Sequence, residues 1–150
     1  MRILIISMLI ALFAAPALAG GGVTTIKSNY GPQKTADRLQ QAVMKKGLTL
    51  FTVIDHAENA KEAGLTMPFT KVFIFGNPKI GTPLMECGRT MALDLPQKML
   101  IHEKDGIVYV SYNDQNYLAK RHELGECAAD KLNKAAKALE SLARQATGQQ

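Results

Sequence analysis

The chain has 150 residues, of which 18 are basic and 13 acidic, and its formal net charge is +5. This length is typical of one domain that buries a hydrophobic core of its own. The basic residues form no run with interleaved aromatic residues, so the charge predicts an ordinary solvated surface and no nucleic-acid binding.

The first 19 residues have the pattern of a secretory signal peptide. Arg2 supplies a positive charge, residues 3–13 are apolar and uncharged, and Ala17-Leu18-Ala19 is a small-x-small cleavage pattern. The alternative is a membrane anchor, but Pro16 and the glycines at 20–22 interrupt the helix before the roughly 20 apolar residues that spanning needs.

We therefore expect cleavage after Ala19, a periplasmic or secreted location, and no membrane contact after cleavage. The mature chain would be one domain over residues 20–150. Its formal net charge would be +4, because only one basic residue, Arg2, is removed from a chain of charge +5.

Cys87 and Cys127 are the two cysteines of the chain. An oxidising compartment favours a disulfide between them, which would close a loop of about 40 residues. The alternative is two unrelated buried thiols, and the sequence leaves both open. The absence of CxxC and CxxCH patterns argues against thioredoxin-like redox sites and covalent c-type haem attachment.

The N-terminal part predicts a strand, a helix and a second strand. Residues 23–28 are β-branched and roughly alternating, which favours an opening strand. After Gly31-Pro32 the apolar period becomes helical, and Gly47 lies where this helix should end. Residues 48–54 are apolar on both faces apart from threonines, which predicts a strand in the centre of the sheet.

A short helix is then expected between Asp55 and Gly64, with Asp55 as N-cap and Glu58 at the third helical position. Residues 71–75 predict a third strand. Residues 78–89 have the composition of an ordered loop with one helical turn, capped by Thr82 and beginning at Pro83.

The C-terminal part predicts strand 92–102, broken at Pro96, and a turn at 103–106 that leads into strand 107–112. Asp114 is expected to cap a short helix. A long helix follows, and its apolar face consists of Ala128, Leu132, Ala135, Leu139, Leu142 and Ala146. This order predicts an α+β two-layer sandwich, with a mainly antiparallel sheet and helices packed on one face.

Two histidines lie at positions where they could carry chemistry. His56 follows Asp55 at a strand-to-helix junction, and His122 lies in a polar stretch before the terminal helix. Such a histidine can act as a base, a metal ligand or a hydrogen-bond donor. The alternative for Asp55 and His56 is a helix cap and a surface imidazole.

The sequence gives little support for a metal site or for one of the common catalytic sites. His56, His102 and His122 lack the spacing of known zinc sites. The soft donors Met67, Met85, Cys87 and Met91 fit no regular metal motif, and methionine more often fills core gaps. There is no GxSxG elbow, P-loop or GxGxxG, and no serine at a recognisable spacing from a histidine and a carboxylate.

An ordered series of short sequence motifs covers nearly the whole mature chain. The motifs are Ile54-Asp55-His56-Ala57, residues 60–65, Ile74-Phe75-Gly76-Asn77-Pro78, Gly81-Thr82-Pro83-Leu84-Met85, Leu93-Asp94-Leu95-Pro96, Val110-Ser111-Tyr112-Asn113 and residues 118–122. The series resembles the family filed as domain of unknown function 302. The resemblance implies an α+β fold similar to the TATA-binding-protein type, often as a homodimer.

The resemblance says little about activity, and the cofactor, if there is one, stays unknown. By position it gives a set of candidate ligand-binding residues, which are Asp55, His56, Asn77, Thr82, Asp94, Tyr112 and His122. Turn and cap formation is the alternative role for Asn77, Thr82 and Asp94. The cysteines are not part of the family pattern, so a disulfide would be a feature of this branch.

Three hypotheses follow. The first is a non-catalytic binding module for a small molecule or metal ion, in a cleft lined by Asp55, His56, Tyr112 and His122. The second is an enzyme in which His56 and His122 share acid–base duty. The third is a structural or assembly protein with a large exposed apolar patch.

Overall fold

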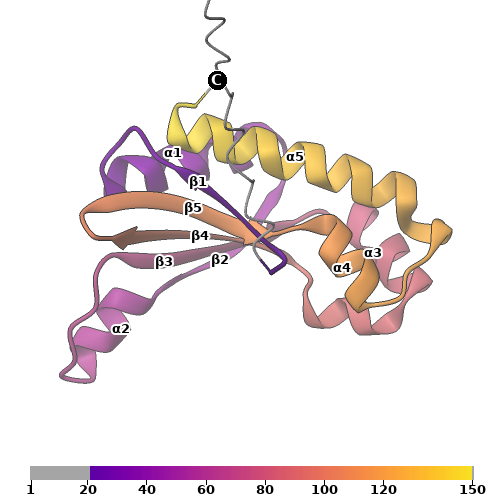
Figure 1. The fold of residues 1–150 in the computed structure, drawn as a ribbon, viewed down its shortest axis with the longest axis horizontal. Coiled ribbons are helices and arrows are strands. Elements are labelled where there is room, and N and C mark those ends of the chain that lie inside the picture. The colour runs from indigo at the N-terminus through magenta and orange to yellow at the C-terminus, as the bar shows by residue number, and fades with distance from the viewer. Residues whose placement is uncertain (1–20, 150) are drawn as a thin grey trace, which may run out of the picture.

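The computed structural model describes residues 21–149, and the expected signal peptide lies outside the described residues. Five strands form one sheet in the order β1-β5-β4-β3-β2, with every neighbouring pair antiparallel (Figure 1). The strands are β1 (Val23–Lys27), β2 (Thr49–Asp55), β3 (Thr70–Gly76), β4 (Gln97–Lys104) and β5 (Ile107–Asn113).

Two long helices, α1 (Pro32–Lys45) and α5 (Ala129–Thr147), pack together on one face of the sheet (Figure 1). The α2 helix (His56–Glu62) joins β2 to β3 at one end of the strands. Four short elements gather near the other end, and they are α3 (Pro78–Cys87), η1 (Arg89–Leu93), α4 (Gln115–Arg121) and η2 (Glu126–Ala128). The predicted α+β sandwich with an antiparallel sheet is confirmed.

The main core lies between the sheet and the two long helices. Alternate residues of the central strands point into it, and Phe73, Phe75 and Ile101 are at most 2% exposed. The predicted apolar face of α5 supplies Leu139 and Leu142, which are buried against them. Each such side chain contributes roughly 1.5–3 kcal/mol by leaving water.

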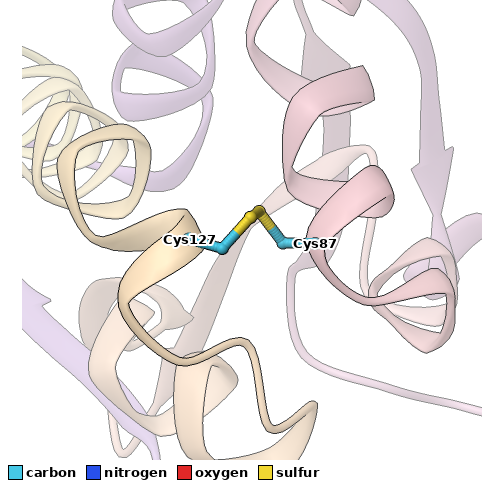
Figure 2. The surroundings of a disulfide bond; sticks show 2 residues. All are labelled: Cys87 and Cys127. Carbon is cyan, nitrogen blue, oxygen red and sulfur yellow. A yellow bond between two sulfur atoms is a disulfide. The ribbon is translucent and has the colours of Figure 1, made fainter.

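A second, smaller core holds the short elements together. It contains Leu84, Met91, Leu118, Leu124, Ala128 and Leu132. Cys87 at the end of α3 forms a disulfide with Cys127 in η2, and the two Cα atoms are 5.8 Å apart (Figure 2). The bond ties α3 to the segment that leads into α5, so the disulfide alternative is the one that the structure contains.

The prediction that residues 48–54 form a central strand is wrong. They form β2, which is the edge strand beside β3. Phe51 is 50% exposed and Val53 is 36% exposed. The strand β2 is therefore apolar on both faces although it is not a central strand of the sheet.

Two further boundaries differ from the sequence prediction. Residues 78–87 form a helix, because Asn77 accepts a hydrogen bond from the Lys79 N–H and Pro78 occupies the first turn, while Pro83 lies inside the helix. Residues 89–93 form the 3-10 helix η1, so residues 92 and 93, the first two of the predicted strand 92–102, are not in a strand. Strand β4 begins only after Pro96, which has no N–H to donate to a ladder.

Candidate functional site

The seven residues suggested by the resemblance lie at two opposite ends of the sheet. Asp55 and His56 are at the junction of β2 and α2, where β3 begins. The other five lie near the end where β3 and β5 finish and β4 starts, and they are Asn77, Thr82, Asp94, Tyr112 and His122. His56 and His122 are therefore not brought together, and the proposed shared acid–base site is not assembled.

Asp55 caps α2, as its spacing from Glu58 predicted. Its Oδ1 accepts a hydrogen bond from the Glu58 N–H at 3.1 Å, and its Oδ2 lies 2.9 Å from Lys71 Nζ. The hydrogen bond from Lys71 and those from the helix N-terminus lower the pKa of the Asp55 carboxyl. His56 is exposed at the first position of α2.

Asp94 and His122 are in direct contact although 28 residues separate them. His122 Nε2 lies 2.6 Å from Asp94 Oδ2, and Arg121 Nε lies 3.3 Å from the same oxygen. His122 Nδ1 is hydrogen-bonded to Thr90 Oγ1 at 3.1 Å. His122 is the C-cap of α4, and Asp94 is the C-cap of η1.

Tyr112 belongs to the main core. It is 9% exposed, on the face of β5 that packs against the helices. Burial raises the pKa of its phenol, and the nearby Glu140 carboxylate raises it further. Tyr112 therefore does not share an open cleft with Asp55 or His56.

An apolar cavity of about 260 Å³ lies between α3, α5 and the adjoining ends of β2, β3 and β4. Asn77 and Thr82 line it, but Asp55, His56, Asp94, Tyr112 and His122 do not. The apolar lining residues are Leu48, Phe51, Phe75, Pro78, Ile80, Leu84, Met85, Leu95, Pro96, Ala135, Ala138, Leu139 and Leu142. This volume is close to the lower end of small-molecule pockets, which is roughly 300 Å³.

The chemistry of the cavity wall is almost entirely hydrocarbon. Its polar side chains are Asn77, Thr82 and Gln97, and no ionisable side chain lines it within residues 21–149. The Asn77 oxygen already caps α3, and Gln97 is paired with the buried Gln115 at 3.1 Å. Such a wall suits an uncharged apolar molecule, since it offers no partner for a buried charge.

Sequence reasoning missed this cavity. Its lining comes from five separate elements, and only their packing brings the residues together. The available signal was the apolar run at 48–54, in which Phe51 lies on an edge strand and faces the cavity. This pattern favours a central strand, whereas Phe51 lies beside a pocket.

Sequence reasoning also missed a polar cluster formed by side chains of adjacent strands. His102 Nε2 is 3.0 Å from Ser111 Oγ, which in turn is 2.9 Å from Thr25 Oγ1. The His102 ring stacks on Tyr109, with ring centroids 5.6 Å apart. Burial lowers the pKa of His102, and the nearby Lys104 lowers it further.

No group of three or more histidine, cysteine, aspartate or glutamate side chains within the described residues could hold a metal ion. Likewise, no helix in the part of the chain that the structure describes is long and apolar enough to cross a membrane.

Comparison with known proteins identifies relatives over most of the chain. Residues 24–142 match the family described as "Domain of unknown function DUF302". The fold also resembles a crystal structure of an uncharacterized conserved DUF302 protein from Bacillus stearothermophilus, with a TM-score of 0.72 and 19% identity. That match covers 83% of this chain and 98% of the other.

Curated relatives come from Brucella. A protein of Brucella suis named "Fluoride-specific ion channel FluC 1" is 41% identical over 110 residues, which is 73% of this chain and 43% of that protein. A protein of the same name from Brucella abortus is also 41% identical, over 41% of its length. The chain thus spans less than half the length of these relatives.

Proposed function

The chain belongs to the family described as domain of unknown function DUF302, and we propose that this member is an exported domain whose cavity binds one uncharged apolar small molecule. The observation that carries the proposal is the hydrocarbon-lined cavity between α3, α5 and the sheet. A cavity with this lining gains free energy when apolar surface of a ligand replaces water.

The polar groups at the cavity define how a ligand would be oriented. Thr82 on α3 and Asn77 at its N-terminus lie on one wall, while Leu139 and Leu142 of α5 lie on another. A ligand with an apolar body and a single hydroxyl or carbonyl would place that group near Thr82. A carboxylate or ammonium ligand would be excluded by the cost of burying its charge.

Export is the second part of the proposal. Its support is the leader pattern of residues 1–19 and the disulfide between Cys87 and Cys127, which an oxidising compartment favours. N-terminal sequencing of protein from the periplasmic or culture fraction should begin after Ala19. Recovery of the intact chain in the cytosol would contradict export.

Ligand binding is tested on protein purified from its own host without denaturation. Native mass spectrometry should detect an added mass, and extraction with organic solvent should release a neutral compound. A charged or strictly polar compound in the extract would contradict the proposed ligand class. Protein whose mass equals that of the mature chain in every preparation would count against a tightly bound ligand.

A second candidate function comes from the names of the Brucella relatives. A domain 41% identical to part of a fluoride channel could support fluoride export without binding the ion. The apolar cavity does not suit fluoride, because a small anion needs donors or cations when it leaves water. Deletion of the gene should then increase sensitivity to fluoride, and unchanged growth in fluoride would exclude this role.

A further inference from the structure

Three polar side chains near α3 and α4 form a continuous chain of hydrogen bonds. Thr90 Oγ1 lies 3.1 Å from His122 Nδ1, and His122 Nε2 lies 2.6 Å from Asp94 Oδ2. His122 is buried, with 7% of its surface exposed, whereas Thr90 is exposed. A hydroxyl at the surface is thus connected to a carboxylate through a buried imidazole.

The partners of the ring define its tautomer. An ionised carboxylate only accepts hydrogen bonds, so a neutral His122 carries its proton on Nε2, toward Asp94. Nδ1 is then unprotonated and accepts the hydrogen bond that the Thr90 hydroxyl donates. This is the arrangement in which an imidazole can remove a proton from a nucleophilic hydroxyl.

The disulfide already links the two segments that carry this cluster. Cys87 lies three residues before Thr90, and Cys127 lies five residues after His122. A covalent bond and the surrounding apolar contacts thus hold the segments together.

An exposed apolar side chain stands beside the hydroxyl. Leu93 is 74% exposed and follows Thr90 by three residues in η1. Side chains three residues apart in a 3-10 helix lie on the same side. From these contacts we propose that Thr90, His122 and Asp94 form a hydrolytic site for small esters of apolar carboxylic acids, with Leu93 contacting the acyl chain.

The first half of the reaction acylates the protein. Thr90 Oγ1 attacks the ester carbonyl carbon and its proton passes to His122 Nδ1, while Asp94 holds the imidazolium. The bond from the carbonyl carbon to the alcohol oxygen then breaks. The alcohol leaves with the proton from Nδ1, and the acyl group stays on Thr90 as an ester.

Water completes the cycle. It gives a proton to His122 Nδ1 as its oxygen attacks the acyl carbon, and the bond to Thr90 Oγ1 then breaks. Thr90 recovers the proton from Nδ1, and the carboxylic acid is released. This activity goes beyond the proposed binding function and uses none of the cavity-lining residues.

The test uses purified protein with p-nitrophenyl butyrate as the probe. Wild type should hydrolyse it above the background rate, and rapid acid quenching should trap one butyryl group on the peptide that contains Thr90. Thr90→Val keeps the side-chain shape but removes the hydroxyl, and it should lower kcat/KM by about 100-fold and abolish the adduct. Thr90→Ser should retain both.

Thr66→Val is the matched control, because Thr66 is an exposed threonine between α2 and β3. It should keep wild-type turnover and the wild-type melting temperature, and Thr90→Val, which leaves the buried His122 Nδ1 without its hydrogen-bond partner, is assayed well below its own melting temperature. Hydrolysis no faster than background would overturn the proposal. So would a butyryl group on another residue, or equal turnover in wild type and Thr90→Val.

Discussion

The two carboxylate oxygens of Asp55 have different partners. Oδ1 caps α2, and Oδ2 pairs with Lys71 on β3. The cap depends on a hydrogen-bond acceptor, whereas the pair depends on the charge. Because the Asp55 side chain is 38% exposed, solvent screens the pair, and we expect it to contribute less than about 1 kcal/mol.

Substitution and pH separate these two contributions. The folded-state pKa of Asp55 is lower than its ordinary value of 3.8, so the stability from its ionised form is present above that pH and is lost as the pH falls through the folded-state pKa. Asp55→Asn keeps the cap and should destabilise the protein near neutral pH but progressively less in acid. Asp55→Ala also removes the cap, so its free energy of unfolding should be lower than that of Asp55→Asn by about 1 kcal/mol. Urea unfolding between neutral and acid pH measures both, and a pH-independent loss in Asp55→Asn would contradict the role of the charge.

Local capping could be predicted from sequence, but long-range pairing could not. Asp55 and Asp114 cap helices through N–H groups three residues away, which the spacing already indicated. The contact between Asp94 and His122 depends on how η1 packs against α4. Sequence identified both residues through the family resemblance, but it gave no reason to place them together or to include Thr90.

Among the elements, α3 and η2 depend most on a covalent connection. The disulfide closes a separation of 40 residues, and the chain-entropy estimate of its contribution is about 4 kcal/mol. The double variant Cys87→Ala, Cys127→Ala should have a free energy of unfolding about 4 kcal/mol lower than that of the oxidised wild type. Denaturant unfolding measures the loss, and reduced wild type should behave like the double variant. Equal stability of oxidised and reduced protein would contradict this role.

Element types were easier to predict than element positions. The apolar period of α5 was visible because one face of a helix repeats every three or four residues. The position of β2 was not, since an apolar strand that lines a pocket has the composition of a central strand. The length of α3 was underestimated because Pro83, a residue that disfavours helix interiors, lies within it.

At the scale of the molecule, β2 leaves one edge of the sheet unpaired within the described residues. An apolar edge strand with free backbone groups favours pairing with another strand, and the family resemblance predicts a homodimer. We therefore expect the dimer to form through β2. Val53→Lys should shift sedimentation from dimer to monomer, because Val53 lies on this edge.

Val23→Lys is the matched control, since Val23 is 49% exposed on the opposite edge strand, β1. It should leave the dimer intact. A monomeric wild type at high concentration would contradict the dimer itself, and a dimeric Val53→Lys would contradict the assignment to β2.

The apolar cavity is tested most directly by titration with the neutral fluorescent probe N-phenyl-1-naphthylamine. Wild type should bind it saturably, and Ala138→Phe, which fills the cavity from α5, should weaken binding by at least about tenfold, or 1.4 kcal/mol. Ala63→Phe at the exposed end of α2 is the control and should bind like wild type. With melting temperatures unchanged, equal probe affinity in wild type and Ala138→Phe would contradict binding in this cavity.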